Sequence, residues 1–245
     1  HILEELAQKG YVRVKDLAEQ LAVSLVTIRK DLKTLEERSL LFRSHGSASV
    51  RQPNISERSV AEKETLHAQE KQYIAQRATE LLLAEEAIII GSGTSALAFA
   101  KALPRDLNLI VTTAAMNVSL ALVNHEHIEL IQLGGIVRKQ ATSVTGSFAE
   151  DMLRHLSCNT LFLGVDGISP DFGLTTSNIG EAHLNQKMIE SVQRTIVLCD
   201  SSKFGLRGFG KICEVEDIDM VITDKDAPKD MIGEIEERGV KVIIA

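Results

Sequence analysis

The run Val14-Lys-Asp-Leu-Ala-Glu-Gln-Leu-Ala-Val-Ser24 and the run Val26-Thr-Ile-Arg-Lys-Asp-Leu32 decide the fold of the N-terminal part of the chain. In the first run, apolar side chains recur at intervals of three and four residues up to Leu21, which predicts a short amphipathic helix. Ser24 is a residue type that caps helices, so a new helix is expected to begin directly after it. Two helices joined this tightly are typical of a helix-turn-helix.

The helix predicted after Ser24 has an apolar face and a polar face. The outward side chains that suit the major groove of DNA are Thr27, Arg29, Lys30 and Lys33. A preceding helix that stops at Gly10 completes a three-helix unit. The last helix of such a unit enters the major groove, so we expect these four side chains to contact DNA and Ser24 to contact a phosphate. The alternative is a solvated basic face on a three-helix interaction module.

A small wing is expected after the helices. Leu40-Leu-Phe-Arg43 followed by Ser44-His-Gly-Ser47 predicts a strand and a turn. Arg43 and His45 would then lie beside the phosphate backbone of the DNA.

These N-terminal runs closely resemble the DeoR family of bacterial transcriptional regulators. The wing of that family commonly reads Arg-x-His-Gly-Gly-Ala, and this chain has Arg43-Ser-His-Gly-Ser-Ala48, with Ser47 in place of the second Gly. The resemblance implies a winged helix-turn-helix domain that binds double-stranded operator DNA.

Charge is unevenly distributed along the chain. The 245 residues carry a net charge of −7, which taken alone disfavours nucleic acid as a partner. Residues 1–55 hold nine basic and seven acidic side chains, a balance of +2 that leaves −9 for the remainder. We therefore expect the N-terminal part to meet DNA and the acidic remainder to be repelled by it.

Composition excludes several classes of protein. Hydrophobic residues make up 44% of the chain and prolines number only 4, which argues against disorder, and no long apolar run predicts a membrane-spanning helix. Cys158, Cys199 and Cys213 lie far apart, so reduced thiols of a cytoplasmic protein are expected rather than a disulfide frame or a metal site. Because the chain begins at His1, a short N-terminal segment is expected to be missing, and no secretory signal is visible.

Beyond the wing, residues 49–66 are polar and predict a connector that becomes helical in its second half. From Ala87 onward, β-rich runs alternate with amphipathic helices, which predicts an α/β fold with a mostly parallel sheet covered on both faces. The expected strands are 87–90, 109–112, 129–133, 160–164, 195–199, 220–223 and 240–244.

Three parts of the chain follow from this pattern. We expect a winged helix-turn-helix domain at residues 1–52, a linker at 53–70 and an α/β effector-binding domain at 71–245. In α/β sheets of this kind, ligands bind beyond the carboxyl ends of the strands.

The first such strand end is followed by Gly91-Ser-Gly-Thr-Ser95, which opens a helix. Small residues and a helix N-terminus can hold an anion, so Ser92, Gly93, Thr94 and Ser95 are candidate effector contacts. The run also fits a dinucleotide fingerprint, but that site needs an acidic residue at the end of the second strand, where Thr112 stands. Dinucleotide binding is therefore disfavoured, no cofactor is expected, and a simple packing turn remains the alternative.

Polar side chains also follow the other predicted strands. The candidate effector contacts among them are Thr112, Gly135, Arg138, Asp166, Gly167, Thr175, Thr176, Glu181 and Lys203. Cations and N–H groups suit a phosphate, and carboxylates suit the hydroxyl hydrogens of a sugar. A phosphorylated sugar is the simplest ligand for the whole set, although each residue taken alone could be a capping carboxylate or a surface lysine.

The C-terminal part is similar to the effector domain of the same DeoR family. The likeness rests on Gly91-Ser-Gly-Thr94, Gly164-Val-Asp-Gly-Ile168 and Asp200-Ser-Ser-Lys-Phe-Gly205, among other runs, and covers nearly the whole chain. It implies a fold related to ribose-phosphate isomerases and CoA transferases and a sensor of sugar phosphates or related metabolites. Family members often have Asp at the position of Gly91 and Thr-Asn after the second strand, and both departures touch the expected pocket.

The leading hypothesis is a transcriptional regulator, a repressor of a sugar-metabolism operon, whose DNA affinity is controlled by a phosphorylated sugar. Paired operator half-sites require a symmetric homo-oligomer, a dimer or a tetramer. The rival is a sugar-phosphate isomerase-like enzyme carrying a helical module, with Glu181 or Asp166 as general base. No catalytic triad accompanies them, so no catalytic residue is assigned. A third possibility is an interaction module with a vestigial pocket.

Overall fold

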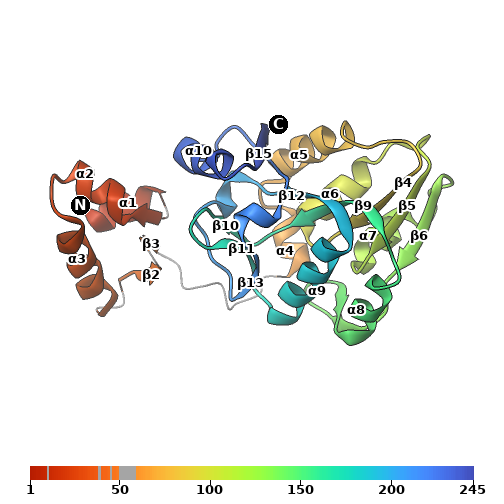
Figure 1. The fold of residues 1–245 in the computed structure, drawn as a ribbon, viewed down its shortest axis with the longest axis horizontal. Helices are drawn as coiled ribbons and strands as arrows, with labels where there is room; N and C mark the ends of the chain where they lie inside the picture. The colour runs from red at the N-terminus through yellow and green to blue at the C-terminus, as the bar shows by residue number, and fades with distance from the viewer. Residues whose placement is uncertain (10, 38–39, 45, 50–58) are drawn as a thin grey trace.

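Three helices pack around a small apolar core in the N-terminal part of the computed structural model, which describes the chain apart from residues 10, 38–39, 45 and 50–58 (Figure 1). They are α1 (Ile2–Lys9), α2 (Val14–Gln20) and α3 (Leu25–Glu37). Leu6, Ile28 and Leu32 are fully buried between them. The apolar faces predicted for the three helices therefore meet, while the predicted stop at Gly10 lies outside the described residues.

A three-stranded antiparallel sheet completes this part of the chain, which we call the head (residues 1–49). Its strands are β1 (Tyr11–Arg13), β2 (Phe42–Ser44) and β3 (Ser47–Ser49), in the order β1-β3-β2. The wing was predicted and is confirmed. β1 was not predicted, because three residues between two helices are too short to show an alternating pattern.

The rest of the described chain, residues 59–245, forms what we call the sheet domain (Figure 1). Its seven strands are all parallel and lie in the order β15-β14-β12-β9-β4-β5-β6. Their bounds are β4 (Glu86–Ile90), β5 (Leu109–Thr113), β6 (Ile128–Gln132), β9 (Cys158–Gly164), β12 (Val192–Leu198), β14 (Met220–Thr223) and β15 (Lys241–Ile244). Each of the seven predicted strands is one of these, which confirms the α/β fold class.

Helices cover both faces of the sheet. They are α5 (Ala68–Thr79), α6 (Thr94–Ala102), α7 (Met116–Leu122), α8 (Ser147–Leu153), α9 (Ile179–Glu190) and α10 (Lys229–Glu237). On one face, Phe99 of α6 stacks on Phe162 of β9 with ring centroids 4.1 Å apart. On the other face, Met188 and Ile235 of α9 and α10 are buried in a separate cluster. Among the described residues, no helix is long and apolar enough to cross a membrane.

Short strands outside the main sheet were not predicted. β7 (Ile136–Arg138) pairs with β8 (Ser143–Thr145), and β10 (Gly167–Ser169), β11 (Gly173–Thr176) and β13 (Gly210–Cys213) form a small antiparallel sheet. These strands follow the carboxyl ends of the long ones. They therefore shape the edge of the sheet where a ligand is expected.

The helix α4 (Val60–Glu64) lies in the second half of the predicted linker, which was expected to become helical. Ser59 and Glu62 close a capping box at its start. The N–H of Val60 donates to the carbonyl of Gln140, 2.9 Å away, which ties α4 to the sheet domain. The expected boundary between head and linker, at residues 52 and 53, lies outside the described residues.

Lys71 fixes the other end of α4. This lysine is 5% exposed, and its Nζ donates to the carbonyl oxygens of Lys63 and Leu66 at 2.6 and 2.5 Å. Burial lowers the pKa of Lys71 below its ordinary value, with Asp200 acting in the opposite direction. α4 is thus held at both ends by the domain that follows it.

Candidate functional site

The polar face of α3 is exposed as the sequence predicted. Thr27, Arg29, Lys30 and Lys33 all project from the surface of the head. The side chain of Ser24 accepts a hydrogen bond from the N–H of Thr27 at 3.1 Å, so it caps the helix. One side chain that sequence reasoning left out also stands on this face: Val26, in the first turn, is 70% exposed.

Arg43 lies where the wing meets α3. Its Nη1 is 3.6 Å from Oε2 of Glu36, and its backbone N–H donates to Oε1 of the same carboxylate at 3.1 Å. The guanidinium is therefore held at the base of the wing, beside the exposed face of α3. His45, the other residue expected on the wing, lies outside the described residues.

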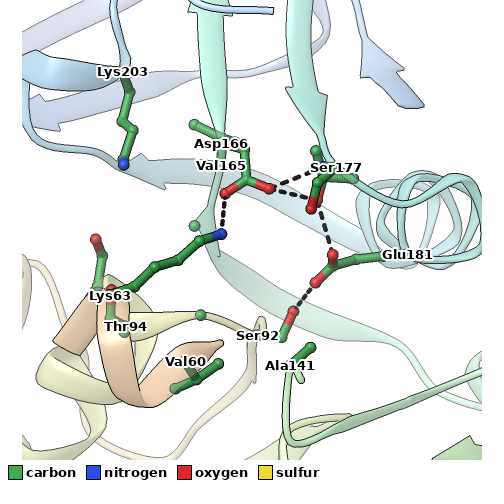
Figure 2. Close-up of a pocket in the computed structure, with 14 residues that line it drawn as sticks. Val60, Lys63, Ser92, Thr94, Ala141, Val165, Asp166, Ser177, Glu181 and Lys203 are labelled. Atoms are coloured by element: carbon green, nitrogen blue, oxygen red, sulfur yellow. Dashed lines mark hydrogen bonds and ion pairs between the residues drawn. The ribbon is translucent and has the colours of Figure 1, made fainter. Parts of the chain in front are cut away.

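A pocket lies at the carboxyl ends of β4, β9 and β12, which are neighbours in the sheet. Its lining residues, drawn in Figure 2, are Val60, Lys63, Ser92, Gly93, Thr94, Ser95, Ala141, Gly164, Val165, Asp166, Thr176, Ser177, Glu181 and Lys203. The structure thus brings together these predicted contacts: Ser92, Gly93, Thr94, Ser95, Asp166, Thr176, Glu181 and Lys203.

Asp166 lies at the centre of the pocket and is bonded from two sides. Its Oδ1 accepts a hydrogen bond from Nζ of Lys63 at 2.7 Å, and its Oδ2 accepts one from the N–H of Ser177 at 2.9 Å (Figure 2). Burial alone would raise the pKa of this carboxyl. The Lys63 ammonium and the Ser177 hydrogen bond outweigh burial and hold the pKa of Asp166 below its ordinary value. Asp166 is therefore ionised at neutral pH.

Glu181 forms the second carboxylate of the pocket. Its Oε1 accepts a hydrogen bond from the hydroxyl of Ser92, and its Oε2 accepts one from the hydroxyl of Thr176 at 2.8 Å. Arg138 also approaches Oε2, with Nη1 at 2.8 Å. This arrangement joins the loop after β4, the end of β11 and the first turn of α9 through one side chain (Figure 2).

The start of α6 forms the wall of the pocket below Asp166. Gly93 is its N-cap, with a φ of +103° that favours glycine, and no side chain caps this helix end. The first N–H groups of a helix have no partner within it, so the N–H groups of Thr94 and Ser95 are donors for an anion. The ammonium of Lys203 points into the same space and, among the described residues, donates no hydrogen bond (Figure 2).

Arg138 and Thr112, two of the predicted contacts, stand behind the lining. Arg138 is 10% exposed and contacts the pocket residue Glu181. Thr112 is buried on β5 and does not line the pocket. The strand-end rule places both residues at the edge of the sheet where the pocket lies, but it does not distinguish the strands nearest the pocket from their neighbours.

The remaining predicted contacts have local structural roles. The hydroxyl of Thr175 is fully buried, where it accepts the N–H of Gly208 at 2.8 Å. Gly167 lies so close to the carbonyl of Leu206 that a Cβ there would be 2.2 Å from it. Gly135 has a φ of +151° and faces the backbone of β8. The structure does not bring these three residues to the pocket lining.

Lys63 is the main functional candidate that sequence reasoning missed. It lies on α4, in a segment predicted as linker, more than a hundred residues before its partner Asp166. A single lysine on a short polar helix carries no signal of its own, so only the packing of α4 against the sheet domain reveals it. Among the described residues, no cluster of side chains is suited to hold a metal ion.

The fold and the site define a class of protein: a winged helix-turn-helix joined to an α/β domain with a polar pocket at the carboxyl ends of its strands. Residues 1–54 match the DeoR-like helix-turn-helix domain, and residues 66–225 match the DeoR C terminal sensor domain. The chain therefore belongs to the DeoR family. It is a DNA-binding transcriptional regulator and not an enzyme, which decides against the isomerase alternative.

Individual proteins named as transcriptional repressors are similar to this chain over nearly its whole length. The chain is 38% identical to a putative aga operon transcriptional repressor of Escherichia coli O157:H7, over 99% of this chain and 91% of that protein. It is 30% identical to the glycerol-3-phosphate regulon repressor of Escherichia coli K12, over 93% and 90%. Among solved structures, ribose 5-phosphate isomerase A of Methanocaldococcus jannaschii is similar, with a TM-score of 0.43 and 17% identity over 56% of this chain and 55% of that one.

Proposed function

We propose that this regulator is a repressor of a sugar-metabolism operon and that a phosphorylated sugar bound in the pocket controls its affinity for operator DNA. The observation that carries the proposal is the chemistry of the pocket, in which two lysines and an uncapped helix N-terminus face two carboxylates. Two relatives, named as repressors of an aga operon and of a glycerol-3-phosphate regulon, support the same reading.

The phosphate would bind at the start of α6. Thr94 and Ser95 offer N–H and hydroxyl donors there, and Lys63 and Lys203 approach from opposite sides (Figure 2). The helix dipole adds a positive potential at the same point. A dianionic phosphate matches two ammonium groups, which an uncharged sugar does not.

The sugar would lie toward Asp166 and Glu181. Both carboxylates accept hydrogen bonds from hydroxyls or N–H groups within the protein, so they are suited to accept them from ligand hydroxyls as well. A phosphate oxygen placed beside Lys63 would compete with Asp166 for its ammonium. Lys63 lies on α4, which directly follows the connection to the head. Whether the Lys63 ammonium contacts Asp166 or the phosphate can therefore bias how the head is held.

The head would read DNA through α3. We assign base and phosphate contacts to Thr27, Arg29, Lys30 and Lys33, with Ser24 and Arg43 on phosphates, and we add Val26 as an apolar contact for a thymine methyl group. His45 stays a proposed phosphate contact of the wing.

The remaining features of the proposal concern the whole assembly. Paired operator half-sites require a homo-oligomer, a dimer or a tetramer, and a sugar-operon repressor acts in the cytoplasm. The proposed division of the chain is a winged helix-turn-helix domain at 1–52, a linker at 53–70 and an effector domain at 71–245, with Val60 and Lys63 of the linker contributing to the pocket.

The test is fluorescence anisotropy of a labelled DNA fragment from upstream of the regulated genes. Ribose 5-phosphate and glycerol 3-phosphate are added in turn, with ribose and glycerol as unphosphorylated controls. We expect specific binding of the fragment and a change in its affinity with phosphorylated compounds only. Equal effects of phosphorylated and unphosphorylated compounds would contradict a phosphate site, and equal binding of a scrambled fragment would contradict an operator-specific head.

A further inference from the structure

The head and the sheet domain touch through β1 and α10. Arg13 of β1 donates a hydrogen bond to Glu234 and lies 3.8 Å from Oδ2 of Asp230, and both carboxylates belong to α10. The guanidinium side chain is only 11% exposed. A cation of the head is thus withdrawn from solvent and paired with an acidic helix of the sheet domain.

Tyr11, two residues before Arg13, makes an apolar contact with the same region. Its ring packs against the core cluster of the sheet domain that contains Phe204 and Met231. A Cβ on Gly205 would lie 2.9 Å from Cγ of Tyr11, so only glycine leaves room for the ring in this position. Burial, followed by the nearby Asp230, raises the pKa of Tyr11 to about 12. The contact between head and sheet domain therefore combines an ion pair with a fitted aromatic ring.

One side chain of the proposed reading face, Arg29 of α3, lines a groove that the head shares with α10 of the sheet domain. The charged side chains that line the groove between the two parts are Arg13, Lys15, Arg29, Asp171, Glu234, Glu237 and Arg238. The cation that the sheet domain contributes, Arg238, is bonded to Glu216 and so is partly neutralised. A DNA phosphate that approached Arg29 along this groove would meet the carboxylates of α10 and be repelled.

We propose that this contact is a closed state in which the acidic helix α10 and DNA compete for the head. In the closed state Arg13 and Tyr11 hold the head on the sheet domain, and DNA binding requires their release. The inference rests on the head being the DNA-binding part of the regulator, and it does not depend on which effector the pocket takes. Gly205, against which the ring of Tyr11 packs, lies two residues after the pocket residue Lys203. Gly205 and Lys203 therefore belong to one turn.

The test compares two matched pairs of variants. Within each pair, a charge of the same sign is removed from two different positions. Arg13→Gln breaks the contact from the head, and Arg43→Gln removes a cation whose ion pair in the described part of the chain, with Glu36, lies within the head. Glu234→Gln breaks the contact from α10, and Glu236→Gln is its exposed neighbour on the same helix. Affinity for a labelled duplex of mixed sequence is measured by anisotropy at low salt.

Loss of a head cation normally weakens DNA binding, so the sign of the change is decisive. We expect Arg13→Gln to bind the duplex roughly three- to tenfold more tightly and Arg43→Gln to bind it more weakly. Glu234→Gln should also bind more tightly, and by more than Glu236→Gln. The closed state would be overturned if Arg13→Gln bound the duplex more weakly than the parent and if Glu234→Gln and Glu236→Gln changed the affinity equally.

A second readout follows the contact itself. The chain has two tyrosines and no tryptophan, so Tyr73→Phe, at a half-exposed surface position, leaves Tyr11 as the sole emitter. In that background we expect acrylamide to quench Tyr11 weakly, and more strongly once Glu234→Gln is added. Unchanged quenching would overturn the proposal, since this variant leaves the head itself intact. If neither the parent nor any variant binds DNA, the reading role of the head fails, and the competition fails with it.

Discussion

Lys63 and Asp166 form an ion pair across the pocket, with Nζ of the lysine 2.7 Å from Oδ1 of the carboxylate. The pair joins the first described helix after the head to the carboxyl end of β9. Both side chains are mostly buried, at 22% and 15% exposed, so the bond is weakly screened by solvent. Because both residues line the pocket, the pair links the pocket to the helix that follows the head.

Replacing Lys63 by Met should weaken binding of ribose 5-phosphate. Loss of one charge-assisted hydrogen bond corresponds to about a tenfold or greater loss of affinity, measured by isothermal titration calorimetry. Lys101→Met is the matched control, because Nζ of Lys101 pairs with Glu64 of the same helix at 2.7 Å but does not line the pocket. A similar loss in both variants would show that α4 matters only as a support.

Asp166→Asn should lower the stability of the protein in a pH-dependent way. The pKa of Asp166 is below its ordinary value in the folded protein, so its ionised form stabilises the fold above the pKa of the unfolded chain. That contribution is lost as pH falls through the folded-state pKa. We expect a deficit of about 2 kcal/mol in the free energy of unfolding at pH 7, shrinking toward zero in acid.

Chemical denaturation at a series of pH values measures this difference. Asp151→Asn is the control, because its exposed pair with Arg154 should contribute little at any pH. A deficit for Asp166→Asn that stays constant down to acid pH would mean that the carboxylate charge is not its cause.

On α3, replacing Arg29 or Lys33 by Ala should reduce affinity for operator DNA and its dependence on salt. Each lost phosphate contact lowers the slope of log affinity against log salt by about one. Anisotropy titrations at several salt concentrations give the slope. An unchanged slope in both variants would place these side chains away from the DNA backbone.

Leu32→Ala should unfold the head selectively. Leu32 is fully buried in the head cluster, which is separate from the two clusters of the sheet domain. The substitution should cost about 2 to 5 kcal/mol, enough to abolish DNA binding by a small domain, while ribose 5-phosphate binding persists. Leu3→Ala, at a position 38% exposed, is the mild control. Equal loss of ligand binding would show that the two parts fold as one unit.

The sequence predicted most of the fold because periodicity is strongest in long elements. Runs such as Ala87–Ile90 and Leu161–Gly164 are apolar throughout, as is expected of strands buried on both faces, and both lie in the seven-stranded sheet. β1 and the short strands after Arg138 and Asp166 carry three or four residues each, too few for a pattern to emerge.

The pocket could be predicted in part for a related reason. Residues that follow a strand directly, such as Ser92 and Asp166, lie where the strand-end rule places them. Lys63 enters the pocket through tertiary packing of a separate helix, which no local pattern encodes. Thr175 shows the converse error, because a hydroxyl that looks available in the sequence is already bonded to the backbone of Gly208.

The double anchoring of α4 has a consequence for how such regulators diversify. The Ser59 cap and the carbonyl bonds of Lys71 fix this helix from within the sheet domain, independently of the residues that precede it. Insertions or deletions before Ser59 would therefore change the reach of the head without disturbing the sensor. Evolution can thus alter the spacing of the DNA sites that are recognised and the metabolite that is sensed as two separate traits.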